Sequence, residues 1–175
     1  MTKAIEINRA LLHHAPIRPM DIIYSRILLE FSGAAGAFFI LYLLFVQLGI
    51  CHWPADTLTM ALGYILVIWF SFAFVLIMAA LAELSETIER VSHIILYLML
   101  PFSGVFIPLY AVPEQFRQIL LYFPLVDAVE LFHHGYYGAR MTTYCNIDYS
   151  ALIILAMTLF GYALTNIAIR RTQLN

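Results

Sequence analysis

The residues best suited to do chemistry in this sequence cluster between positions 127 and 134. Asp127, Glu130, His133 and His134 supply two carboxylates and two imidazoles there. On a helix, Asp127, Glu130 and His134 would share one side, because they are three and four residues apart. Glu130 and His133 also match the Glu-x-x-His element of di-iron bundles, which need that element twice together with two further carboxylates. The element occurs once here, so an intramembrane metal enzyme is the remote alternative.

No other grouping predicts a reaction. His13 and His14 stand beside Pro16, with no third ligand at a spacing that suits a metal. The sequence has no P-loop, no G-x-S-x-G and no H-E-x-x-H. We therefore expect no catalytic residue, no metal and no cofactor bound by this chain. Ionisable residues inside a membrane otherwise indicate a substrate pathway.

Composition predicts the structural class. Of the 175 residues, 63% are hydrophobic and 11% are charged, which is too apolar for an ordinary globular domain. A bilayer core of about 30 Å takes about 20 helical residues, and backbone groups in lipid must be satisfied within the segment. The expected fold is an all-α, polytopic membrane bundle, a single transmembrane domain over residues 1–175. Its spans are expected at residues 27–50, 58–82, 91–112 and 150–169. No basic tract indicates nucleic-acid binding.

The distribution of Lys and Arg predicts the orientation. Seven of the nine lie before the first span, between the second and third, or after the fourth: Lys3, Arg9, Arg18, Arg26, Arg90, Arg170 and Arg171. Arg117 and Arg140 lie on the other side. The positive-inside rule then places both termini in the cytoplasm. Residues 51–56 and 113–149 are expected outside, where Cys51 and Cys145 could form a disulfide.

The outer segment 113–149 looks unlike a simple loop. Pro113 suits the first turn of a helix, and Phe116, Ile119, Leu120 and Phe123 follow at the spacing of one apolar helical face. Arg117 lies on the opposite, polar face together with Glu114 and Gln118. Pro124 interrupts the chain, and a second helix is expected from Leu125 to about His134. Each is too short to span, so we expect two half-helices that enter the outer leaflet, with protein or water receiving their polar sides.

Two stretches carry a family resemblance. "APIRPMDIIYSRILLE" (residues 15–30) and "SGVFIPLYAVPEQFRQILLYFPLVDAVELFHHGYYGAR" (residues 103–140) resemble the inner-membrane permease of capsular polysaccharide ABC exporters, which are of the ABC-2 class. The second stretch is the more specific, with its Gly-x-Phe-x-Pro-Leu, Pro-x-x-Phe-Arg and Pro-Leu-x-x-Ala-x-Glu spacing. The resemblance extends from about Leu11 to about Arg170. Permeases for O-antigen and teichoic acid share much of it.

The resemblance implies a function and its partners. Two permease copies would pair with two ATP-binding cassette subunits, which bind ATP and Mg²⁺ and drive a lipid-linked polysaccharide through the bacterial inner membrane. Periplasmic and outer-membrane export proteins would receive it. The coupling segment (residues 1–21) would contact the ATPase through His13, His14, Ala15, Pro16, Ile17, Arg18, Pro19 and Asp21. The translocation path and its periplasmic gate would include Phe106, Tyr110, Pro113, Phe116, Arg117, Tyr122, Pro124, Asp127 and Glu130.

The sequence departs from that family in one respect. Complete members have six spans, with an interface helix and two spans before the coupling helix, whereas four spans are expected here. The expectation is an N-terminally shortened copy. Three alternatives remain: an ABC-2 permease for O-antigen or teichoic acid, a permease for a small lipid or drug, and the intramembrane metal enzyme.

Overall fold

Every regular element in the described part of the chain is helical. A computed structural model describes residues 19–174. Its helices are α3 (Pro19–Gln47), α4 (Thr57–Leu84), α5 (Glu86–Phe102), α6 (Glu114–Leu120), α7 (Pro124–Tyr137) and α8 (Ile147–Leu174), with 3-10 turns η1 (Leu109–Ala111) and η2 (Gly138–Arg140). α3, α4 and α8 each contain an apolar stretch long enough to cross a membrane. The expected all-α, polytopic membrane bundle is confirmed.

The third expected span, residues 91–112, differs from the helix that the structure shows there, because that helix is shorter. α5 ends at Phe102, and its apolar part, Arg90–Phe102, is shorter than the three candidate spans. Pro101 lies in the last turn and Gly104 has a φ of 79°, a backbone conformation that glycine adopts without a steric penalty. The chain turns there and continues through η1. The apolar run therefore comprises a helix and an irregular loop.

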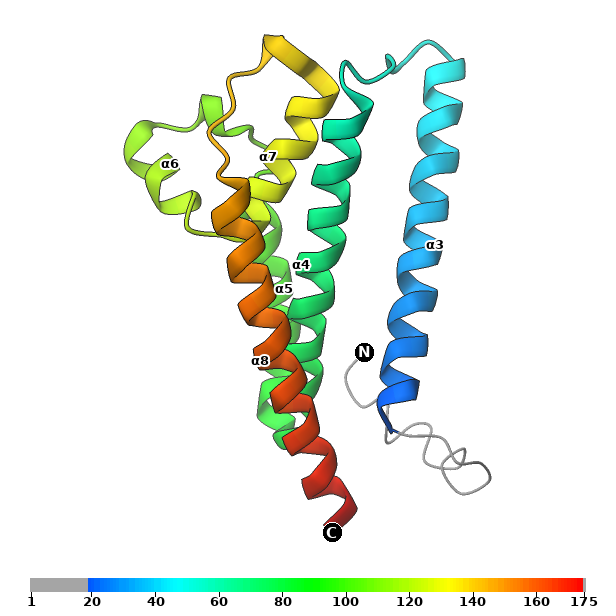
Figure 1. Cartoon of the computed structure of the whole chain (residues 1–175), viewed down its shortest axis with the longest axis vertical. Helices are drawn as coiled ribbons and strands as arrows, with labels where there is room; N and C mark the ends of the chain where they lie inside the picture. The colour runs from blue at the N-terminus through cyan, green and yellow to red at the C-terminus, as the bar shows by residue number, and fades with distance from the viewer. Residues whose placement is uncertain (1–18, 175) are drawn as a thin grey trace.

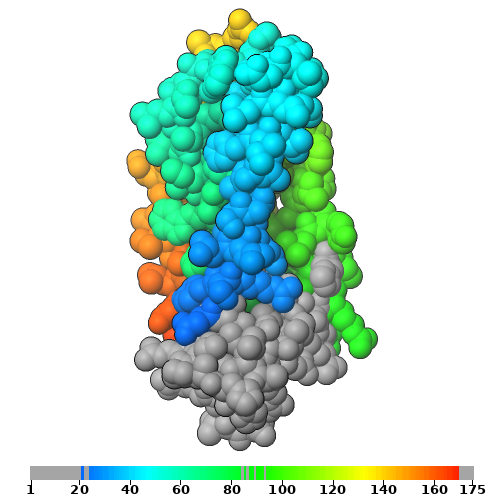
Figure 2. All heavy atoms as spheres, turned by 90° about the vertical axis from the view of Figure 1, so that its right-hand side faces the viewer, coloured from blue at the N-terminus to red at the C-terminus, as the bar shows by residue number. Residues whose placement is uncertain are grey.

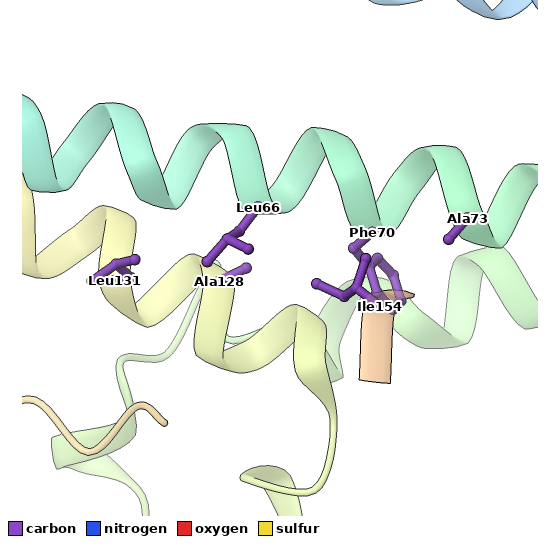
Figure 3. Close-up of a cluster of buried hydrophobic side chains, with 6 residues drawn as sticks. All are labelled: Leu66, Phe70, Ala73, Ala128, Leu131 and Ile154. Atoms are coloured by element: carbon purple, nitrogen blue, oxygen red, sulfur yellow. The ribbon is translucent and has the colours of Figure 1, made fainter. Parts of the chain in front are cut away.

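α4 is the central helix of the bundle. In Figure 1 it runs beside α8 and α7, and these two contacts are the most extensive in the fold. Figure 3 shows where they meet: six buried apolar side chains fill the space between the three helices. They are Leu66, Phe70 and Ala73 of α4, Ala128 and Leu131 of α7, and Ile154 of α8. The Trp69 indole N–H also donates to Thr158 Oγ1 of α8 at 3.1 Å.

Glycines let these helices approach closely. A Cβ on Gly135 of α7 would overlap the backbone nitrogen of Met60 of α4, and a Cβ on Gly63 would overlap the backbone of Phe132. On the α8 side, a Cβ on Gly161 would lie 3.0 Å from the Cβ of Leu76. Small residues at helix contacts are the usual means of packing helices in lipid.

α3 stands apart from this core. Figure 1 shows it separated from the other helices along most of its length, and Figure 2 shows it crossing one face of the molecule. It is held at one end by Ile27, which packs with Leu76, and at the other by the rings of Phe38 and Tyr42. Arg26 and Glu30, one helical turn apart on α3, form an exposed ion pair at 3.4 Å.

The run of small residues at positions 32–37 predicts a surface for close helix packing, because small side chains let another helix approach in lipid. Gly33 and Gly36 of this run have no atom within 4 Å of a Cβ built on them. Within the described residues, therefore, no helix packs closely on this part of α3. The run stays a predicted contact surface.

Candidate functional site

The two short helices expected in residues 113–134 are present as α6 and α7, and their entry into the outer leaflet stays a prediction. α6 begins after Pro113 and α7 begins at Pro124. A tight turn joins the end of α6 to the start of α7. Pro124 occupies the first turn of α7, where its missing N–H breaks no helical hydrogen bond. α7 is longer than expected and continues to Tyr137. Both helices lie toward the end of the molecule that carries the α3–α4 connection (Figure 1).

The apolar face of α6 is directed at α5. Phe116, Ile119, Leu120 and Phe123 all line one cavity of about 630 Å³, as the helical spacing predicted. The opposite wall comes from Leu98, Met99 and Phe102 of α5, and almost all of the lining is carbon. α6 and the end of α5 therefore face each other across an apolar space.

The other face of α6 is directed toward the start of α8. The Arg117 guanidinium lies 4.2 Å from the centre of the Tyr144 ring, in the α7–α8 connection, a cation–π distance. Nearby, the Tyr149 hydroxyl donates to the backbone carbonyl of Tyr122 at 3.3 Å. These contacts fix the α6–α7 turn against the N-terminal end of α8.

Asp127 is enclosed between α7 and α8. Its side chain is 2% exposed. Ser150 Oγ donates to Asp127 Oδ2 at 2.5 Å, and the backbone N–H of Asn146 donates to the same oxygen at 3.4 Å. Asp127 Oδ1 has no hydrogen-bond partner among the described residues. Asp127 thus joins α7 to the first turn of α8.

Glu130 is enclosed on the neighbouring turn of α7, and it is also 2% exposed. The backbone N–H of Leu109 in η1 donates to its carboxylate, while Oε1 has no partner within the described part of the chain. Leu109 is itself fully buried. Glu130 thus joins α7 to the loop that follows α5, and the two carboxylates together join α7 to two segments distant in sequence.

Burial governs the electrostatics of this carboxyl pair (Asp127 and Glu130). Burial raises the pKa of both carboxyls, because the charged form loses its hydration. For Glu130, the negative charge of Asp127 raises the pKa further, while the Leu109 N–H and His134 oppose the rise. Burial, followed by the charges of Asp127 and Glu130, raises the pKa of the Cys145 thiol to about 11. Among the described side chains, no lysine or arginine forms an ion pair with Asp127 or Glu130.

The predicted gate residues occupy two different environments. Phe106, Tyr110, Pro113, Phe116 and Tyr122 are exposed, and Arg117 is half-buried. Pro124, Asp127 and Glu130 are buried. In this arrangement the two carboxylates face protein, so they would have to move in order to line an open path. Their role in the path stays a prediction.

The predicted coupling residues can be located only in part. His13, His14, Ala15, Pro16, Ile17 and Arg18 lie outside the described residues. α3 begins at Pro19, and Asp21 is exposed in its first turn. Asp21 therefore lies inside the helix and not at its N-cap position. An acidic side chain in a first turn still complements the positive end of the helix dipole.

Sequence reasoning missed the partners of the carboxyl pair. Ser150 is 23 positions from Asp127, and a serine at the start of an apolar run carries no signal of its own. The two cysteines are free: Cys51 interacts with Tyr136, whereas Cys145 lies near Asp127 and Glu130. Within the described residues, no three His, Cys, Asp or Glu side chains are grouped as metal ligands.

Comparison with known proteins identifies relatives over most of the chain. The chain is 32% identical over 158 residues to the capsule polysaccharide export inner-membrane protein BexB of Haemophilus influenzae, and 34% identical over 160 residues to the corresponding protein CtrC of Neisseria meningitidis serogroup A. It is 28% identical over 161 residues to the polysialic acid transport protein KpsM of Escherichia coli. These alignments cover 90–92% of this chain. The chain spans about 60% of the length of these relatives.

A family match covers most of the described helices. The pattern of the ABC-2 type transporter family matches residues 9–137. That range includes α3, α4 and α5 and extends through α6 to the end of α7. The chain belongs to the ABC-2 type transporter family.

Proposed function

We propose that this chain is a permease subunit of an ATP-driven exporter that moves a lipid-linked capsular polysaccharide across the bacterial inner membrane. The observation that carries the proposal is the similarity over 90% or more of the chain to relatives named for capsule polysaccharide export and polysialic acid transport. On this proposal the chain acts as a transporter and catalyses no reaction itself. Both termini lie in the cytoplasm, as the distribution of Lys and Arg predicts.

The gate is proposed at the outer end, in residues 113–149. Two short helices separated by a tight turn can change position without unwinding a span, because neither crosses the membrane. In the described arrangement the apolar face of α6 faces the end of α5 across an apolar cavity. The exposed rings of Phe106, Tyr110 and Tyr122 are then available to stack on sugar rings as the glycan passes.

The energy is proposed to come from a partner. An ATP-binding cassette subunit would bind ATP and Mg²⁺ and contact the coupling segment, residues 1–21. A second copy of the permease would complete the path, and periplasmic and outer-membrane proteins would carry the glycan onward. No nucleic acid is involved.

Complementation of a capsule-export mutant tests the proposal. The chain, expressed alone and also joined to the part of a curated relative that it does not match, is supplied with the ATPase subunit, and surface polysaccharide is measured. We expect export in at least the joined form. Arg18→Glu should abolish it while the protein stays in the membrane, because the charge reversal would disrupt the coupling segment. Arg171→Glu, at the cytoplasmic end of α8, is the matched control.

Two outcomes would contradict this assignment. Unchanged surface glycan with Arg18→Glu would argue against the coupling role. Restoration of O-antigen, teichoic acid or drug export, with no capsule export in any arm, would assign the chain to another substrate of the same family.

A further inference from the structure

We propose that the carboxyl pair holds a proton while α7 is packed against α8 and η1, and that loss of this proton releases α7. This would make the outer part of the permease sensitive to the pH outside the cell. The effect of external pH on transport rests on the proposed function. The proton-dependent packing does not, because it is a property of this chain alone.

The burial of the pair is the first step of the argument. Each side chain is 2% exposed, and one oxygen of each has no donor among the described residues. A buried, ionised carboxylate is costly unless it is paired or fully hydrogen-bonded, and in practice such a group takes up a proton. Two carboxylates one helical turn apart raise this cost further, since each opposes the ionisation of the other.

The surroundings of the pair supply no compensating positive charge. α4 contributes no charge, because residues 57–82 contain no charged side chain. From α8 and its preceding loop come the Ser150 hydroxyl, the Asn146 N–H and the Cys145 thiol. η1 contributes the Leu109 N–H. Arg117 of α6 lies over the Tyr144 ring.

The remaining titratable groups lie on α7 itself and at the start of α4. His134 interacts with Glu130 and also with Asp56, so it is shared with an exposed carboxylate. His133 is half-buried, and burial lowers its pKa, which keeps that imidazole neutral near pH 7. The His134 imidazole, which also interacts with Asp56, is therefore the one titratable group among those described that can offset negative charge on Asp127 and Glu130. A proton held by the carboxyl pair lowers that negative charge.

The sign of the pH dependence follows from linkage. A carboxyl whose pKa is raised in the packed state binds its proton more tightly there than when hydrated. The packed state is therefore favoured at low pH, and it is lost as the pH rises through the pKa of the packed pair. Once ionised, the carboxylates gain by leaving their sites beside Ser150 and Leu109 for water. α7 then separates from both segments that it joins.

Cys145 provides a natural reporter, because its thiol lies beside the pair. In a Cys51→Ala chain, Cys145 is the only cysteine. A membrane-impermeant maleimide is added from outside to spheroplasts between about pH 5 and about pH 9, a range that covers raised carboxyl pKa values. The same measurement is made with Asp127→Asn combined with Glu130→Gln. Asp148→Asn, which removes an exposed acid from the same end of α8, is the matched control.

We expect the labelling rate of the unaltered pair, divided by that of the Asn/Gln variant at the same pH, to rise with pH. Between the pKa of the hydrated carboxyls and the raised pKa of the packed pair, the ratio should increase by up to about tenfold per pH unit, as the release of one proton requires, and it should level off at higher pH. Dividing by the variant removes the ordinary ionisation of the thiol. The Asp148→Asn control should reproduce the profile of the unaltered pair.

Two results would overturn the proposal. If the carboxylates ionise without movement, their charges disfavour the thiolate, and the ratio falls below one at high pH. If a cation from elsewhere in the protein pairs with them, the ratio does not change with pH. Hydrogen exchange of α7 amides relative to α4 amides in the unaltered chain is a second readout, which needs no variant. The exchange rate of α7 amides, divided by that of α4 amides, should rise over the same pH range. If this ratio stayed constant, it would count equally against the proposal.

Discussion

At Gly135, the hydrogen in place of a side chain sets how closely α7 and α4 pack. A Cβ there would overlap backbone atoms of Met60, which cannot rotate away as a flexible side chain could. The constraint lies at the helix crossing, two residues beyond His133. The position of the imidazoles and carboxylates of α7 thus depends on a residue that carries no chemistry.

Replacing Gly135 with alanine should destabilise the bundle by about 1–3 kcal/mol or more, the usual cost of overpacking a tight core. Thermal unfolding of the purified protein in detergent measures the change. Gly36→Ala, on the open part of α3, is the control and should be neutral or slightly stabilising, because alanine is the better helix former. Equal melting temperatures for the two variants would show that α7 does not pack closely on α4 at Gly135.

Residue-level prediction from the sequence succeeded where the information was local. The apolar face of α6 follows from the spacing of Phe116, Ile119 and Leu120, and the structure places all three on one cavity wall. The burial of Asp127 was not predictable in the same way, because its partner Ser150 comes from another helix. The spacing of residues along a helix predicts which face of that helix a residue lies on. It does not predict which other helix packs against that face.

At the scale of elements, α7 differs from an ordinary surface half-helix. It is buried along most of its length, whereas α6 has no buried residue. Prolines predicted the breaks around these helices: α6 begins after Pro113, and Pro124 lies in the first turn of α7. The sequence did not predict that α5 ends at Phe102, since the apolar run continues through the following loop without a change in composition.

The difference between α6 and α7 predicts their accessibility. With the native cysteines replaced by alanine, a cysteine at Gln118 should react readily with a water-soluble thiol reagent added from outside, because this side chain is exposed. A cysteine at Ala128, which is fully buried in the core, should react only after denaturation. Ile119, exposed and on the apolar face, serves as the lipid-side control and should react slowly. Equal rates at all three sites would indicate a mobile loop.

At the scale of the whole molecule, the connections segregate to two ends. The α3–α4 loop and the α7–α8 connection lie at one end of Figure 1, and the α4–α5 junction and the end of α8 lie at the other. The sequence predicted this arrangement from the lengths of the apolar runs and from the charges between them. It could not predict that α3 would stand apart, because α3 is as apolar as a well-packed helix.

Reporter fusions test the predicted orientation. Fusions at Trp53 and Tyr144 should report the outside, and fusions at Ser85 and after Leu174 should report the cytoplasm. The latter two positions lie on the side of the spans that carries seven of the nine Lys and Arg residues. Alkaline phosphatase and green fluorescent protein activities provide complementary readouts. A cytoplasmic signal at Tyr144 would invert the outer assignment of α6 and α7.

The separate position of α3 has a consequence for how the protein is made. The rings that hold the far end of α3 belong partly to α7: Phe38 contacts Phe132, and Tyr42 contacts Tyr136. During synthesis, α3 enters the membrane long before those partners are translated, and α4 likewise precedes the helices α7 and α8 that cover it. α3 and α4 must therefore stay in the lipid without their packing partners until α7 and α8 have been synthesised. Assembly of this bundle is completed from its C-terminal half, and a ribosome stalled before α7 would leave two inserted helices without the partners that order them.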